Sequence, residues 1–169
     1  MEKGLDVFSD AIAALRARGV AHKVLVVGEG PARGWFAERV PEAVFTGIQT
    51  GAELGRAVAS MDLLLNPSIT ETFGNVTLEA MASGVPVIAA RATGSTSLVA
   101  DGESGRLVDP GDIAGFAGAI AAYVADPELR RAHGAAGEAR SRAYSWDAIN
   151  RTVADTYLRL VEARRGRSA

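Results

Sequence analysis

Cysteine is absent from the 169 residues, and this absence excludes disulfide bonds and thiolate chemistry. The chain has no apolar run of about 18 residues, the length that a membrane-spanning helix needs, and its start lacks the pattern of a secretory signal peptide. Positive charge is not in excess, because the formal net charge is −2, so electrostatics give no reason to expect nucleic acid as a partner. We therefore expect a cytoplasmic protein that does not bind nucleic acid.

Apolar residues, by contrast, are plentiful enough to build a packed core. Hydrophobic residues make up 48% of the chain and charged residues 22%, a composition typical of folded rather than disordered proteins. At a typical size of about 150 residues per domain, the length predicts one domain over residues 1–169.

Short apolar runs that close on Gly, Pro, Asn or Ser predict β-strands. Because they lack an in–out alternation, they suit parallel strands that are buried on both faces. The runs are HKVLVVG (22–28), AVFTG (43–47), MDLLLNPS (61–68), GVPVIAA (84–90) and a shorter SGRLVDP (104–110).

Helical patterns lie between and after these runs. An apolar stripe begins at Leu5, Asp112 is the expected N-cap of a second helix, and Asp126 followed by Pro127 opens a third. A last helix is predicted from about Trp146 to Arg164, with one apolar face. Strands that alternate with helices predict an α/β fold, a Rossmann-like doubly wound parallel sheet.

Two glutamates stand around the predicted start of a helix, in PSITETFGNVTLEAMASGVPVIA. The helix is expected to begin near Gly74 or Asn75, so that Glu71 precedes it and Glu79 lies about one turn inside it. In an open α/β sheet, ligands bind at the carboxyl ends of the strands, and the free amides of a helix N-terminus can hold a phosphate. A carboxylate accepts hydrogen bonds from adjacent hydroxyls, so the pattern suits a nucleoside diphosphate sugar. The alternative is a solvated loop acid and a partner of the helix dipole.

This stretch resembles the glutamate-x7-glutamate motif of retaining glycosyltransferases of the GT-B fold, family 4 (group 1) type. The resemblance continues through LVVGEGP, VFTG, DGESGRLVDPGD and YSWDAI. It implies a C-terminal, donor-binding half in which Glu71 contacts the donor sugar and Glu79 holds the ribose hydroxyls. It also implies that amides of one turn meet the diphosphate, the turn formed by Phe73, Gly74, Asn75 and Val76.

Two further stretches supply candidate binding residues. Lys3, in MEKGLDVF, matches a lysine that contacts the diphosphate in the family; read without that resemblance, it is a surface lysine. GEGPAR follows a strand, but Arg33 stands where a dinucleotide loop has its third glycine. We interpret Gly28 and Gly30 as a tight turn that lines the donor cleft.

The chain departs from the family pattern at its start, where two elements of the family have no counterpart. The family's first strand, which is central in a sheet of order 3-2-1-4-5-6, has no counterpart before Lys3, and neither does the acceptor domain. We therefore expect a gap in the sheet between residues 22–28 and 61–68. As a fragment, the chain should be marginally stable, self-associating or repacked across that gap. Ser97 also stands where relatives usually carry a glutamate.

The resemblance implies a reaction class. A hexose would pass from a UDP- or GDP-sugar to an acceptor hydroxyl with retention, without a metal or another cofactor, and the fragment alone would be inactive. The acceptor, a glycan, lipid or small molecule, would bind the absent N-terminal domain, and the full-length protein could lie at the inner face of a membrane. The alternatives are a non-catalytic nucleotide-sugar binding module and a phosphorylase-like enzyme of the same fold. We interpret Trp35 and Trp146 as packing residues.

Overall fold

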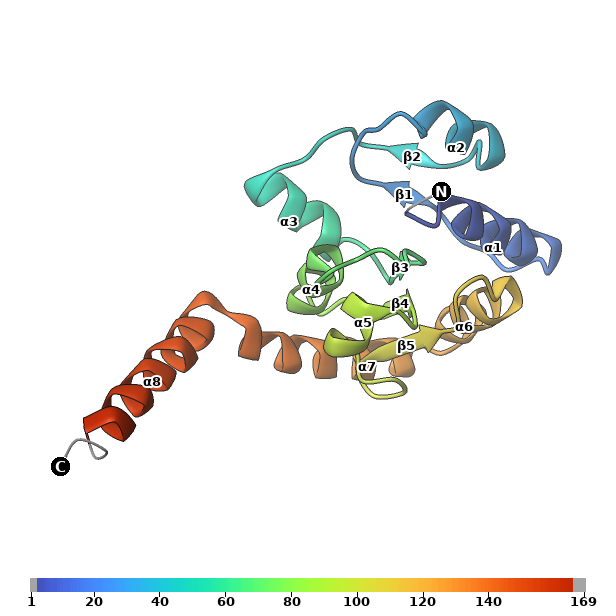
Figure 1. Ribbon diagram of the computed structural model, residues 1–169. Helices are drawn as coiled ribbons and strands as arrows, with labels where there is room; N and C mark the ends of the chain where they lie inside the picture. Colours follow the sequence, from blue (N-terminus) through green and yellow to red (C-terminus); the bar gives the residue numbers. More distant parts are fainter. Residues whose placement is uncertain (1–2, 166–169) are drawn as a thin grey trace.

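The computed structural model describes residues 3–165, and within this range strands alternate with helices (Figure 1). The strands are β1 (Leu25–Val26), β2 (Val44–Phe45), β3 (Leu64–Asn66), β4 (Val87–Ala90) and β5 (Gly105–Val108). The helices are α1 (Leu5–Ala17), α2 (Arg33–Arg39), α3 (Gly51–Ala59), α4 (Asn75–Ala82), α5 (Thr93–Leu98), α6 (Ile113–Ala125), α7 (Pro127–Ser141), the 3-10 helix η1 (Arg142–Tyr144) and α8 (Trp146–Arg165). Each of the five apolar runs thus contains a strand, as predicted.

The strands pair in parallel, but in two separate sheets. β1 pairs with β2, and β3, β4 and β5 form the second sheet in that order. In Figure 1, β1 lies between β2 and β3, so the sheets part between β1 and β3. This is the place where the sequence predicted a gap. The α/β fold with parallel strands is confirmed, with its sheet divided there.

Both faces of the three-stranded sheet are buried, which explains why its strands show no in–out alternation in sequence. Ile88 and Ala90 of β4 point into a core that contains residues of α1 and α6. Val87 and Ala89, the alternate residues of the same strand, point into a second core that contains residues of α3, α4 and α5. All four side chains are fully buried, so helices on both sides exclude water from this sheet.

The two sheets are joined by the first of these cores. Phe36 of α2 makes edge-to-face ring contacts with Phe8 of α1 at 5.3 Å and with Phe45 of β2 at 6.3 Å between centroids. Phe36 and Val24 belong to the same core cluster as Ile88 of β4. Aromatic and aliphatic packing by α1 and α2 therefore holds β1–β2 to the rest of the molecule.

The predicted helix starts agree with the structure at α6 and α7. The carboxylate of Asp112 accepts a hydrogen bond from the Gly115 amide, and that of Asp126 accepts one from the Leu129 amide, with Pro127 as the first residue of α7. α8 has the expected apolar stripe but no buried residue, and its first residue, Trp146, is 78% exposed. The interpretation of Trp146 as a packing residue was therefore wrong, because nothing in the described chain covers α8.

Candidate functional site

The acid loop, residues 69–74, connects the carboxyl end of β3 to α4. Asn66, the last residue of β3, donates from Nδ2 to Thr77 Oγ1 of α4 at 3.2 Å, and its Oδ1 accepts from the Ser68 amide at 3.2 Å. Asn66 and Ser68 are buried, and Thr77 is fully buried. These bonds fix the start of α4 relative to the end of β3, so that the loop between them has defined ends.

Lys3 and Glu71, which are distant in the sequence, form an ion pair at this loop. The Lys3 Nζ atom lies 2.7 Å from Glu71 Oε1, and the side chains are 66% and 17% exposed, respectively. The next residue, Gly4, has φ +65°, and a Cβ atom there would lie 2.6 Å from the Pro67 carbonyl oxygen. Because only glycine fits this approach, α1 begins directly against the end of β3, which places Lys3 over the acid loop.

The N-terminus of α4 is open. Gly74, with φ +92°, is its N-cap residue, and within residues 3–165 no side-chain cap is seen at the first amides of the helix. Asn75 and Val76 are exposed at this end, and Phe73 before them is 39% exposed. A helix N-terminus without a side-chain cap carries partial positive charge and free donors, as the sequence predicted for phosphate binding.

Glu79 lies on α4 with an exposed side chain, four residues after the first residue of the helix. Among the described residues, no ion pair or side-chain hydrogen bond involves its carboxylate. The two acids therefore differ: Glu71 is largely buried and paired with Lys3, whereas Glu79 faces solvent.

The short helix α5 supports the acid loop from behind. The Gly94 amide donates to the Glu71 carbonyl oxygen at 3.0 Å, and a Cβ atom at Gly94 would lie 2.6 Å from that oxygen. The sequence reasoning missed α5, since TGSTSL has no apolar periodicity. The glycine at the position of closest approach was the only available signal.

Gly28 and Gly30 follow β1, where Gly30 begins a turn and Gly28 forms a bridge to Gly47. The Gly28 amide donates to the Gly47 carbonyl oxygen at 2.8 Å, and the Gly30 carbonyl oxygen accepts from the Arg33 amide at 3.1 Å. These bonds join the turn to the segment after β2 and to α2, and the described contacts do not join it to Lys3 or Glu71. That this turn lines a donor cleft stays a prediction.

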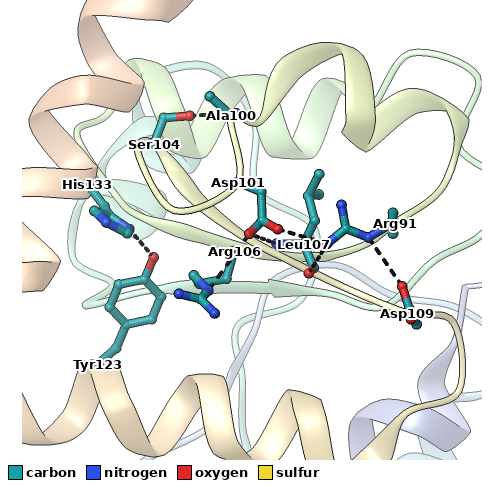
Figure 2. A network of polar contacts seen from close by, with 9 residues as sticks. All are labelled: Arg91, Ala100, Asp101, Ser104, Arg106, Leu107, Asp109, Tyr123 and His133. Atoms are coloured by element: carbon teal, nitrogen blue, oxygen red, sulfur yellow. Dashed lines mark hydrogen bonds and ion pairs between the residues drawn. The ribbon is translucent and has the colours of Figure 1, made fainter.

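A second charged cluster closes the outer edge of β5 (Figure 2). Asp101 accepts hydrogen bonds from the Leu107 amide at 3.0 Å and from Arg91 Nη2 at 2.8 Å, and Arg91 also donates to the Leu107 carbonyl oxygen at 3.0 Å. Partial burial opposes it, but the Leu107 amide and the Arg91 guanidinium lower the pKa of Asp101 below its ordinary value. The amide and the carbonyl group of Leu107 at this edge are thus already paired, which opposes the addition of another strand there.

Tyr123 and His133 form a buried pair next to this cluster, joined by a 2.7 Å hydrogen bond between Tyr123 Oη and His133 Nδ1 (Figure 2). Burial raises the pKa of Tyr123 to about 12. Burial, together with the positive charge of Arg106, lowers the pKa of His133. A hollow of about 430 Å³ between β5 and α6 adjoins Tyr123 and Arg106, away from the acid loop. His133 faces the interior, although α7 is rich in charged residues, because this helix packs on α4 and β5.

In residues 3–165, no cluster of three or more histidine, aspartate or glutamate side chains could hold a metal ion. None of the helices described in that range is long and apolar enough to cross a membrane.

Comparison with known proteins matches residues 1–126 to the family described as glycosyl transferases group 1. A GDP-mannose-dependent alpha-mannosyltransferase of Corynebacterium glutamicum is 35% identical over 127 residues, 75% of this chain and 31% of that protein. The sucrose-phosphate synthase of Thermosynechococcus elongatus superposes with a TM-score of 0.78 at 31% identity, over 96% of this chain and 43% of that one. Anabaena HepE in complex with UDP-glucose superposes with a TM-score of 0.77 at 26% identity, over 92% of this chain and 45% of that one. The chain thus spans less than half the length of each of these proteins.

Proposed function

This chain belongs to the group 1 glycosyltransferases, and we propose that it is the donor-binding part of a retaining hexosyltransferase. The observation that carries the proposal is the meeting of Lys3 and Glu71, 2.7 Å apart, beside the uncapped N-terminus of α4. A cation, a carboxylate and free helix amides at the carboxyl end of a parallel strand are what a diphosphate with an attached sugar requires.

Each charged group has a different part of the donor to bind. The Lys3 ammonium and the α4 amides, at Asn75 and Val76, bind the diphosphate. Glu71 accepts hydrogen bonds from hydroxyls of the hexose, and Glu79, further along α4, accepts them from the ribose diol. In this arrangement Glu71 must exchange its bond to Lys3 for bonds to the sugar when the donor binds.

The same groups assist the departure of the diphosphate. When the bond from the anomeric carbon to the diphosphate oxygen breaks, negative charge gathers on that oxygen. Lys3 and the helix N-terminus are positioned to stabilise this charge, and such preorganised electrostatic stabilisation is usually a large part of catalysis. The acceptor hydroxyl then bonds to the anomeric carbon on the face that the diphosphate left, and its proton passes to the departing diphosphate oxygen.

The proposed donor is a UDP- or GDP-sugar. The mannosyltransferase relative is named for GDP-mannose, and the HepE structure contains UDP-glucose. Both nucleotides are therefore included in the test.

Calorimetric titration with UDP, GDP, UDP-glucose and GDP-mannose tests the proposal. One nucleotide series should bind, and its affinity should fall in Lys3→Ala but not in Lys23→Ala, an exposed lysine on another part of the chain. Absence of binding by every ligand would refute a donor site. Retention is tested separately in the full-length enzyme, by NMR of the anomeric proton of the product.

A further inference from the structure

The acid loop is held from one side by an aromatic residue that lies outside the proposed donor site. The ring of Phe73, in the loop, makes an edge-to-face contact with the ring of Tyr144, with 5.7 Å between centroids and 63° between planes. Tyr144 is the last residue of η1 and is half-buried against the core that contains α4 and α5. A residue 71 positions away in the sequence thus packs directly on the segment that carries Glu71.

Tyr144 also holds the other end of α5. Its Oη atom donates to the Ser97 carbonyl oxygen at 3.0 Å, and Arg140 Nε of α7 donates to the Leu98 carbonyl oxygen at 2.6 Å. At its opposite end, α5 donates from the Gly94 amide to the Glu71 carbonyl oxygen. Tyr144 therefore supports the acid loop in two ways. Its ring contacts Phe73 directly, and its hydroxyl bonds to α5, which in turn bonds to the loop.

We propose that Tyr144 is a positioning residue for the acid loop, and that its ring contact with Phe73 holds Glu71 where a donor hexose binds. The inference rests on the proposed function for the role of Glu71, but the contact itself can be tested without a ligand. Tyr144 touches neither Glu71 nor the α4 amides in the described contacts, so its effect on binding is exerted through Phe73 and α5.

The location of Tyr144 gives this contact a second consequence. Trp146 begins α8 only two residues later, and α8 has no buried residue. Tyr144 is thus an anchored aromatic side chain at the base of α8. Through Tyr144, the segment that leads into α8 is therefore in contact with the acid loop.

Three variants separate the ring from the hydroxyl and from general destabilisation. Tyr144→Phe keeps the ring and loses the bond to Ser97, whereas Tyr144→Leu loses both. Tyr157→Leu, at a residue of α8 that is 67% exposed, is the matched control. The ligand-free readout is hydrogen exchange of the Gly94 amide, which reports whether the acid loop stays on α5.

We expect hydrogen exchange of the Gly94 amide to accelerate about threefold or more in Tyr144→Leu, because an aromatic pair is lost. In Tyr144→Phe and Tyr157→Leu the exchange rate should change less than about twofold. In a Phe73→Leu background, Tyr144→Leu should add little, because the contact is already lost. Equal exchange in all variants, or equal acceleration in Tyr144→Phe and Tyr144→Leu, would overturn the proposal.

The ligand readout is the ratio of affinities for GDP-mannose over GDP, and for UDP-glucose over UDP. Tyr144→Leu should lower the ratio of the series that binds by about threefold or more, because only the intact donor uses Glu71. Equal weakening of donor and diphosphate would reduce Tyr144 to a structural residue and overturn the inference. If the unaltered chain binds none of the four ligands, the proposed function fails, and the exchange experiment alone decides whether Tyr144 holds the loop.

Discussion

The N-termini of α4 and α6 differ, although each helix follows a strand of the same sheet. α6 begins at Asp112, whose carboxylate accepts a hydrogen bond from the Gly115 amide. α4 begins at Gly74 without any side-chain cap. A side chain that satisfies a helix N-terminus occupies the place where a ligand would bind, so of these two helices α4 alone keeps its amides available to an anion.

The charged residues near these two helices differ in the same way. Around β5, Arg91 pairs with Asp101 and with Asp109, and the edge amide of Leu107 is bonded to Asp101. Around α4, Lys3 reaches Glu71, but Glu79 faces solvent. A charged cluster whose members satisfy one another stabilises an edge, whereas a cluster with open positions is suited to binding. The following substitutions test this distinction.

The largest effect is expected from Gly94→Ala. The new Cβ atom would lie 2.6 Å from the Glu71 carbonyl oxygen and 3.0 Å from the Phe73 carbonyl carbon, so backbone must move. Overpacking of this kind costs about 1–3 kcal/mol, and it should also weaken binding of the intact donor. Urea unfolding and calorimetry measure the two effects.

Gly118→Ala in α6 is the control, because nothing lies within 4 Å of a Cβ atom there. Alanine in a helix interior should stabilise the chain by up to about 1 kcal/mol and leave binding unchanged. If Gly94→Ala behaved like Gly118→Ala, the close contact of α5 with the acid loop would not exist in solution.

Lys3→Ala should weaken the nucleoside diphosphate about tenfold at low salt, since a hydrogen bond to a charged group is lost, and barely affect the nucleoside. The loss should shrink as salt rises, because Lys3 is exposed. Titration of both ligands at two salt concentrations measures this. Equal losses for diphosphate and nucleoside would show that Lys3 acts on folding rather than on phosphate.

Asp112→Ala tests α6, the helix of the pair whose N-terminus has a side-chain cap. Loss of an N-cap costs about 0.5–2 kcal/mol, so the midpoint of unfolding should fall. Affinity for nucleoside diphosphates should not fall, because in the unaltered chain Asp112 occupies this helix end and no ligand binds there. A loss of affinity larger than twofold would mean that the α6 end also takes part in binding.

The smallest effect is expected from Asp101→Asn, about 1 kcal/mol or less at pH 7, because the pair with Arg91 is partly exposed. The folded-state pKa of Asp101 lies below its ordinary value of 3.8, so the contribution of this carboxylate is present above pH 3.8 and is lost as pH falls through the folded-state value. The difference between variant and unaltered chain should therefore shrink below pH 3.8.

Urea unfolding between pH 7 and pH 3 measures this difference, with Asp155→Asn, at an exposed acid of α8, as control. A difference that grows as the solution becomes more acidic would contradict the assignment.

Local sequence signals predicted the strands, the start of α4 and the caps at Asp112 and Asp126, because each depends on residues that are neighbours in the chain. The division of the sheet was predicted from the family resemblance instead, since it follows from the strand order of that family. Contacts between distant segments had no such signal. Gly94 against Glu71, Tyr144 against Phe73 and the bonds from Arg91 and Asp101 to β5 depend on tertiary packing.

For Trp146 the sequence predicted a packing contact that the structure does not show. A large apolar residue is buried only where the chain supplies a partner surface. The pairing of Lys3 with Glu71 was predicted only in part. Both residues were singled out, but their 2.7 Å contact depends on the close approach of Gly4 to Pro67.

The most direct test of the central claim is the binding of a nucleoside diphosphate and of its hexose conjugate to Glu71→Gln and Glu79→Gln, with Glu103→Gln as an exposed control. Glu79→Gln should weaken both ligands about ten- to a hundredfold, because a charge-assisted bond to the ribose is lost. Glu71→Gln should weaken only the conjugate and leave the diphosphate unchanged or slightly tighter, since Lys3 is then released from its pair. If Glu71→Gln weakened the bare diphosphate as much as Glu79→Gln does, the division of the donor between the two acids would be wrong.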